Sequence, residues 1–165
     1  MKEKCITQHS VSDRETINLG QKIGTLLVAG DVVGLVGELG SGKTWFAKGL
    51  ALGLGVSPNT IITSPSFTLI NEYEGRYKFF HMDVYRLESL SDLLSAGLDE
   101  YFYKDGVVAM EWADRWPEIL PSWWLKVELI IIDDISREII LSSFHPRVFE
   151  TLKKAVETES YVPEG

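Results

Sequence analysis

The N-terminal third of the chain alternates amphipathic and fully apolar segments. Residues 12–29 open with Ser12, followed three residues later by Glu15, and their apolar positions recur at helical spacing, which predicts an amphipathic helix. Residues 32–36 (VVGLV) are continuously apolar and rich in β-branched side chains, which is typical of a strand covered on both faces in a parallel sheet. Residues 44–53 predict a second helix that ends at a glycine.

The middle of the chain continues the alternation of strands and helices. Residues 77–83 and 107–110 are short apolar runs that predict strands, and residues 89–96 predict a helix between them. Residues 61–70 are interrupted by Ser-Pro-Ser, and because proline cannot donate a ladder hydrogen bond they do not form one uninterrupted central strand.

The C-terminal part of the chain predicts a hairpin and a closing helix. Two β-rich runs within residues 124–142 flank an acidic turn, and residues 149–156 predict a helix, while residues 158–165 are expected to be a frayed tail. Strands that alternate with helices predict the α/β class. We expect residues 1–165 to form a single domain, a mainly parallel sheet flanked by helices with a C-terminal antiparallel β-hairpin.

Charge and cysteine content restrict the class of function. The net charge is −8, from 16 Lys and Arg against 24 Asp and Glu, and nucleic-acid affinity depends largely on basic residues, so direct RNA or DNA binding is disfavoured. No apolar run reaches the ~18 residues of a membrane-spanning helix, so no membrane association is expected. The single cysteine, Cys5, suits the reducing cytoplasm.

One glycine-rich segment matches the phosphate-binding P-loop pattern G-x-x-x-x-G-K-[ST] at every defined position. It lies between the strand predicted for residues 32–36 and the helix predicted for residues 44–53, as this loop requires. Backbone N–H groups would surround phosphate, Lys43 would place its ammonium against the β- and γ-phosphates, and Thr44 would ligate Mg²⁺. We therefore expect a P-loop NTPase domain with these nucleotide-binding residues: Gly37, Glu38, Leu39, Gly40, Ser41, Gly42, Lys43 and Thr44.

A P-loop protein also needs an acidic residue at the end of another strand to hold Mg²⁺. Asp83 and Glu111 each end a short apolar run, and both would reach the carboxyl edge of the sheet, where ligands bind in open α/β folds. One would hold the metal while the other positions the attacking water. Asp133 also follows an apolar run, but it falls in the predicted hairpin turn, where acidic residues are simply good turn formers. Arg86 is either a phosphate sensor or a surface residue.

The residues themselves leave three functions open. The guanine-reading sequence N/T-K-x-D is absent, which favours ATP over GTP. An ATPase, a small-molecule kinase and a non-catalytic, ATP-gated binding module would all use the same loop, although no Arg-rich lid typical of kinases is evident.

The order of the motifs resembles the TsaE family, also called YjeE. The resemblance covers about residues 10–115, and the C-terminal third adds little to it. It rests on four segments in the family's order: residues 37–44 (GELGSGKT), residues 63–69 (TSPSFTL), residues 81–87 (HMDVYRL) and the pair Glu111-Trp112.

The resemblance implies an ATPase that bacteria need to make N6-threonylcarbamoyladenosine at position 37 of tRNA (t6A37). It implies action on the complex of the threonylcarbamoyl-transferase subunit TsaD with its paralogue TsaB, and contact with tRNA only through these partners. The implied cofactors are ATP and Mg²⁺, with hydrolysis that is slow until the partners contribute.

Carried onto this sequence, the resemblance assigns roles to individual residues. Lys43, Asp83 and Glu111 would be catalytic, and Thr44 would join the two acids on the metal side. Trp112 would lie beside the nucleotide, although a core aromatic is its structural alternative. Asp13 would approach the adenine.

Overall fold

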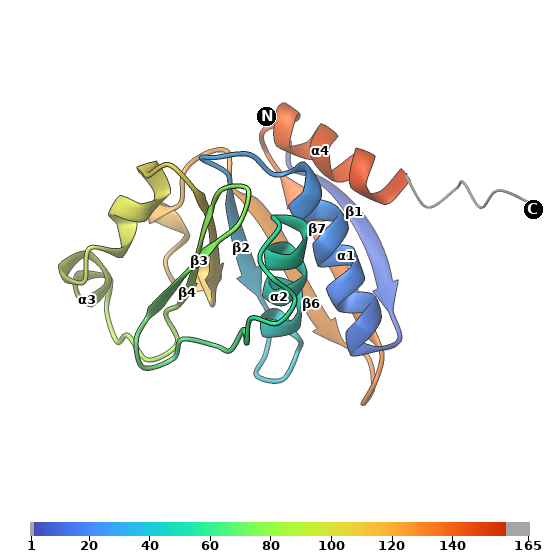
Figure 1. The fold of residues 1–165 in the computed structure, drawn as a ribbon, viewed down its shortest axis with the longest axis horizontal. Coiled ribbons are helices and arrows are strands. Elements are labelled where there is room, and N and C mark those ends of the chain that lie inside the picture. Colours follow the sequence, from blue (N-terminus) through green and yellow to red (C-terminus); the bar gives the residue numbers. More distant parts are fainter. Residues whose placement is uncertain (1, 158–165) are drawn as a thin grey trace, which may run out of the picture.

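In the computed structural model, residues 2–157 are described, and they form one seven-stranded mixed sheet with helices on both faces (Figure 1). The expected frayed tail, residues 158–165, lies outside the described residues. The strand order is β1-β7-β6-β2-β5-β4-β3. The strands are β1 (Lys4–Ser10), β2 (Val32–Val36), β3 (Ile70–Glu74), β4 (Lys78–Asp83), β5 (Val107–Glu111), β6 (Leu125–Ile131) and β7 (Arg137–Ser143). The helices are α1 (Asp13–Leu26), α2 (Lys43–Gly53), α3 (Leu90–Ser95) and α4 (Pro146–Glu157), with 3₁₀ turns η1 (Leu98–Tyr103), η2 (Ala113–Arg115) and η3 (Pro117–Ile119).

The centre of the sheet is parallel and its two edges are antiparallel. Strands β6, β2, β5 and β4 run in one direction, while β7 and β1 add an antiparallel edge beside β6, and β3 adds another beside β4. The α/β class and the C-terminal hairpin, β6–β7, are therefore confirmed, and the expected parallel arrangement holds for the central strands.

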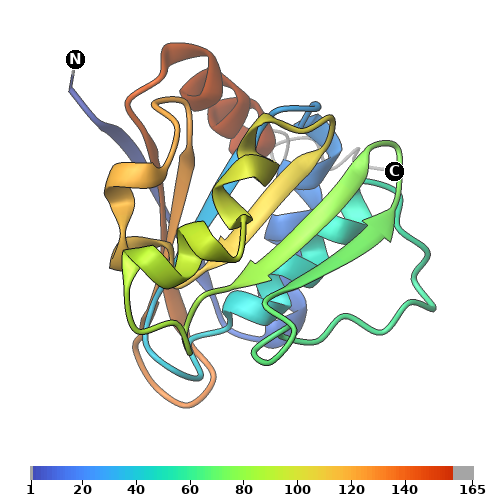
Figure 2. The same cartoon turned by 90° about the vertical axis from the view of Figure 1, so that its left-hand side faces the viewer.

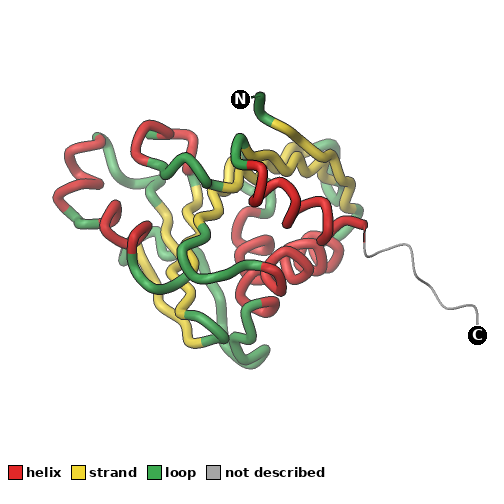
Figure 3. The backbone as a smooth tube through the Cα atoms, turned by 90° about the horizontal axis from the view of Figure 1, so that it is seen from above, coloured by secondary structure: helices red, strands yellow, loops and turns green. Residues whose placement is uncertain are grey.

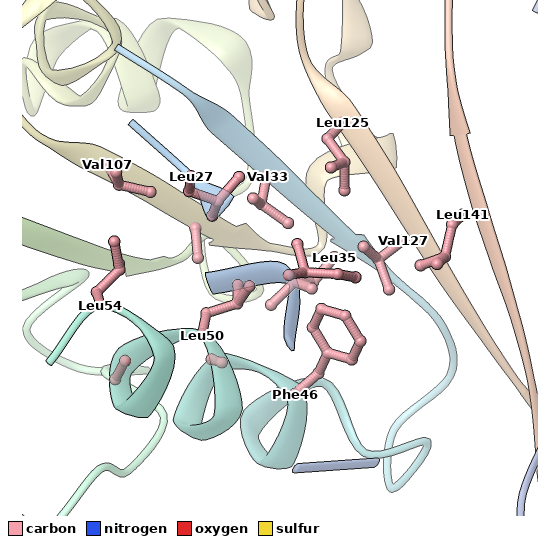
Figure 4. Close-up of a cluster of buried hydrophobic side chains, with 14 of the residues drawn as sticks. Leu27, Val33, Leu35, Phe46, Leu50, Leu54, Val107, Leu125, Val127 and Leu141 are labelled. Atoms are coloured by element: carbon pink, nitrogen blue, oxygen red, sulfur yellow. The ribbon is translucent and has the colours of Figure 1, made fainter. Parts of the chain in front are cut away.

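Two apolar layers hold the helices onto the sheet. Helices α1, α2 and α4 cover one face, and α3 with η1 covers the other (Figures 1 to 3). Along β2, Val33 and Leu35 pack beneath Phe46 and Leu50 of α2 (Figure 4), whereas the alternate residues face the second layer. Because both faces are covered, the strand needs apolar residues at every position. No helix among residues 2–157 combines the length and apolar character required to cross a membrane.

Helices α1 and α2 approach each other closely through glycines. A Cβ atom added at Gly49 of α2 would collide with the Ile17 carbonyl oxygen and lie 2.9 Å from the Gln21 nitrogen of α1. Gly20 of α1 faces this contact from the other side. This close crossing fixes the position of α2, whose first residue, Lys43, belongs to the glycine-rich segment.

The start of α1 confirms the predicted capping pattern. The Ser12 hydroxyl accepts a hydrogen bond from the Glu15 N–H at 3.1 Å, and the Glu15 carboxylate accepts one from the Val11 N–H at 2.9 Å. The helix ends at Leu26, three residues earlier than the predicted range. Strands β1 and β3 were not predicted; both are edge strands that expose every second side chain.

Candidate functional site

The glycine-rich loop (residues 37–44) connects the end of β2 to the first turn of α2, at the edge where the parallel strands end (Figure 1). Gly42 precedes α2 in the left-handed region, with φ +105°, which residues with a Cβ atom rarely adopt. At Gly37 a Cβ atom would lie 2.6 Å from the Leu129 carbonyl oxygen of β6. Both glycines of the motif are thus required by the backbone itself.

Lys43 lies buried at the centre of this loop. Its Nζ donates hydrogen bonds to the Gly37 and Glu38 carbonyl oxygens at 2.6 and 2.8 Å, and it lies 4.0 Å from the centre of the Trp112 ring. Burial lowers the pKa of the Lys43 ammonium, while the nearby Glu111 carboxylate acts in the opposite direction. The loop therefore holds a desolvated cation beside its own main chain.

Asp83 and Glu111 are brought together at the ends of neighbouring strands. They are register partners in the parallel pair β4–β5, with exposed fractions of 3% and 2%. The Thr44 hydroxyl donates to Glu111 Oε1 at 3.0 Å. Asp83 accepts hydrogen bonds from the Ser64 hydroxyl and, at 2.8 Å, from the Tyr85 N–H. Both carboxylates are therefore buried and accept hydrogen bonds.

His81 is a partner of Glu111 that the sequence analysis did not identify. Its Nε2 lies 2.6 Å from Glu111 Oε2, the ring is fully buried, and Nδ1 has no hydrogen-bond partner among residues 2–157. Placing the ring proton on Nε2 leaves no N–H unpaired, so His81 donates to the Glu111 carboxylate. One signal in the sequence could have identified His81. Side chains two residues apart on a strand lie on the same face, so His81 lies on the same face of β4 as Asp83.

Lys43, Thr44, Asp83 and Glu111 line one cavity of about 390 Å³, whereas His81 does not. Most of the predicted site residues line it. The lining residues are Leu39, Gly40, Gly42, Lys43, Thr44, Trp45, Ser64, Ser66, Asp83, Tyr85, Arg86, Glu111 and Trp112. Gly37, Glu38 and Ser41 belong to the loop but do not line the cavity.

Trp112 and Arg86 occupy the wall of the cavity. The Trp112 backbone is left-handed, with φ +65°, and its ring lies 4.8 Å from the Tyr85 ring. Trp112 is half-buried, lines the cavity and also packs against the second apolar layer, so its place beside the nucleotide stays a prediction. The Arg86 guanidinium lies 3.9 Å from the centre of the exposed Phe67 ring.

Outside the loop, the predicted residue Asp13 and the rejected candidate Asp133 also lie away from the cavity. Asp13 is exposed in the first turn of α1, so its approach to adenine stays a prediction. Asp133 lies in the β6–β7 turn, where its carboxylate accepts the Ile135 and Ser136 N–H groups at 3.0 and 2.7 Å.

The chemistry of the cavity suits a hard divalent cation and an anion. Thr44, Asp83 and Glu111 contribute hydroxyl and carboxylate oxygens, the donors Mg²⁺ prefers, and Lys43 contributes a cation. Within residues 2–157 no group of three or more His, Cys, Asp and Glu side chains is arranged to hold a metal ion.

Residues 10–139 match the family described as "Threonylcarbamoyl adenosine biosynthesis protein TsaE". The chain belongs to the TsaE family. The match extends beyond the region that carries the sequence motifs and includes β6 and the start of β7.

Curated TsaE-family relatives match over most of their length. The "tRNA threonylcarbamoyladenosine biosynthesis protein TsaE" of Treponema pallidum (strain Nichols) is 43% identical over 139 residues, covering 84% of this chain and 99% of that protein. The protein of the same description from Bacillus subtilis (strain 168) is 41% identical over 141 residues, covering 85% and 87%. The crystal structure of Bacillus subtilis YdiB superposes with a TM-score of 0.82 at 34% identity, covering 97% of this chain and 99% of that one. The family resemblance and the fold are thereby confirmed.

Proposed function

We propose that this TsaE-family chain is a Mg²⁺-dependent ATPase that supports t6A37 modification of tRNA by acting on the TsaB–TsaD complex. The observation that carries the proposal is the convergence of Lys43, Thr44, Asp83 and Glu111 on one cavity behind a glycine-rich loop. The tRNA part comes from the family, whose curated relatives are named for threonylcarbamoyladenosine biosynthesis. The net charge of −8 supports action through protein partners rather than direct binding to tRNA.

Lys43 and the loop would hold the phosphates of ATP. The ammonium, now shared between the Gly37 and Glu38 carbonyl oxygens, lies within reach of a phosphate placed against the loop. The first turn of α2 adds the positive end of its dipole. Both features favour the phosphate oxygens, over which the negative charge of the transferred group is spread.

Thr44, Asp83 and Glu111 would hold Mg²⁺ and orient the attacking water. Mg²⁺, when bound, supplies neutralisation of phosphate charge. The Glu111 carboxylate is held by the Thr44 hydroxyl and by His81 Nε2, so its direction is fixed before substrate arrives. Water attack on the γ-phosphorus breaks its bond to the bridging oxygen and yields ADP and free phosphate.

The test is phosphate release from ATP and Mg²⁺, with this protein alone and with a purified TsaB–TsaD pair. We expect slow release alone and strong stimulation by the pair. Absence of stimulation would remove the partner assignment, and a phosphorylated metabolite in place of free phosphate would establish the kinase alternative.

The Lys43→Ala variant tests the nucleotide site directly. Loss of charge-assisted hydrogen bonds worth about 1.5–3 kcal/mol should weaken ATP binding roughly 10- to 100-fold and abolish stimulated release. Lys48→Ala is the matched control, since Lys48 also lies on α2 but does not line the cavity. Unchanged ATP affinity in Lys43→Ala would show that the loop is not the nucleotide site.

A further inference from the structure

Arg137, the first residue of β7, binds the glycine-rich loop from outside the cavity. Its Nε donates to the Ser41 carbonyl oxygen at 3.0 Å, and its Nη2 donates to the Gly40 carbonyl oxygen at 3.2 Å. Arg137 does not line the cavity, whereas Gly40 and Gly42 do. The guanidinium therefore touches the loop on the side away from any bound phosphate.

The same guanidinium is anchored to the β6–β7 turn. Its Nη1 donates to the Asp133 and Ser136 carbonyl oxygens at 2.7 and 2.9 Å. The turn is itself closed by the Asp133 carboxylate, which accepts the Ser136 N–H at 2.7 Å. Figures 1 and 2 both show the glycine-rich loop and this turn next to each other at the lower end of the molecule. Arg137 thus connects the glycine-rich loop to a closed turn.

Hydrogen bonds to loop carbonyls also determine where the loop N–H groups point. A trans peptide is planar, with its C=O and N–H directed oppositely, and residues 2–157 contain no cis peptide bond. When Arg137 holds the Ser41 carbonyl outward, the Gly42 N–H of the same peptide unit is directed inward. A phosphate in the cavity would be bound by such N–H groups.

We propose that Arg137 is a positioning residue, which holds the glycine-rich loop in its phosphate-binding conformation by fixing the Gly40 and Ser41 carbonyls to the β6–β7 turn. Glycines give this loop wide conformational freedom, so fixing it beforehand reduces the entropy lost on binding. Arginine suits the task because its planar fork presents five donors in fixed directions, whereas a lysine ammonium cannot span the four carbonyls.

The inference rests on the proposed nucleotide site, and its test separates the two. We would measure the Kd for Mg²⁺-ATP in the wild type and in Arg137→Ala, Arg137→Lys and Arg137→Gln, together with KM and kcat for stimulated phosphate release. We expect Kd and KM to rise about tenfold in Arg137→Ala and Arg137→Lys, with kcat at saturating ATP within about twofold of the wild type. A wild type that does not bind ATP would reject the proposed function itself.

Two outcomes would overturn the positioning role while leaving the nucleotide site in place. Wild-type affinity in folded Arg137→Ala would show that the contacts are only structural, and full affinity in Arg137→Lys would show that charge alone matters. Arg147→Ala is the matched control, because Arg147 is a partly exposed arginine whose partner, Asp31, precedes β2 and so lies at the opposite end of that strand from the loop. Its removal should affect stability without changing Kd.

Hydrogen exchange provides a second measurement that does not depend on catalysis. In the nucleotide-free protein, we expect amides of residues 37–44 to exchange faster in Arg137→Lys and Arg137→Gln than in the wild type, with α4 unchanged. Equal exchange in the loop of all three proteins would overturn the proposal, even if Arg137→Ala fails to fold.

Discussion

The glycine-rich loop and the β6–β7 hairpin lie next to each other, but only the loop carries a sequence motif. Lys43, Thr44 and the loop glycines are restricted by side-chain chemistry and by backbone conformation, so few residue types fit them. In the hairpin, the Leu129 carbonyl lies close to Gly37, and Arg137 donates its hydrogen bonds to the loop and the turn through main-chain carbonyls. Side chains whose residue type is restricted by a site form a recognisable sequence motif. A side chain that contacts only main-chain atoms elsewhere in the fold belongs to no such motif.

The acidic residues of the two regions show the same contrast. Asp83, Glu111 and Asp133 each follow an apolar run, but the first two are buried with side-chain hydroxyl or imidazole partners. Asp133 is exposed, and its carboxylate accepts the main-chain N–H groups of Ile135 and Ser136. Asp83 and Glu111 share a cavity with Lys43, and the proposed function gives them a chemical role, whereas Asp133 closes a turn.

The largest expected effect comes from removing the charge of Glu111 while keeping its shape. Glu111→Gln should lower stimulated phosphate release at least about 100-fold, because an amide neither activates water nor balances the metal charge, while ATP binding stays within a few-fold of the wild type. The measurement is kcat at saturating Mg²⁺-ATP, combined with calorimetric binding. Glu72→Gln, an exposed acid on β3, should leave both unchanged. Wild-type turnover in Glu111→Gln would instead favour the non-catalytic, ATP-gated module.

An intermediate effect is expected from a substitution at Gly49, where α1 packs closely against α2, the helix that follows the loop. In Gly49→Ala the new methyl group would meet the Ile17 carbonyl, so the helices must separate. Overpacking of this kind costs about 1–3 kcal/mol of unfolding free energy. The thermal midpoint should fall by several degrees in calorimetry, and ATP affinity should weaken because α2 begins at Lys43. Lys48→Ala provides the comparison in the same helix, and an unchanged midpoint in Gly49→Ala would contradict the close crossing.

The strands differ in how well the sequence predicts them, because central and edge strands are buried to different extents. Strands β2, β4 and β5 are covered on both faces, so their continuous apolar runs identify them. The edge strands β1 and β3 leave most of their residues exposed or half-buried and are rich in polar side chains, so hydrophobicity alone does not separate them from loops.

The sequence predicted those site residues whose type is tied to a chemical role, and it did not predict those whose role depends on the contacts of the folded chain. The loop motif and the two acids at strand ends predicted the main wall of the cavity. The His81–Glu111 contact depends on the register of β4 with β5, and the Arg137 contacts join residues 96 and 97 positions apart. Such pairings follow from sheet order, which no local pattern in the sequence contains.

The smallest effect is expected at Asp133, where the contrast between a turn acid and a site acid can be tested most directly. The Ile135 and Ser136 N–H groups hold the pKa of Asp133 below its ordinary value, so the folded state favours the carboxylate. Its stabilisation is therefore complete above the ordinary pKa of about 4 and is lost as the pH falls through the lower folded-state pKa. Asp133→Ala should lower the thermal midpoint slightly at pH 7, and the difference from the wild type should shrink below about pH 4. Phosphate release at saturating Mg²⁺ should stay within about twofold of the wild type, because the substitution keeps the Asp133 carbonyl that Arg137 binds. A large loss of Mg²⁺-dependent release would instead place this carboxylate at the metal and remove the distinction between the two regions.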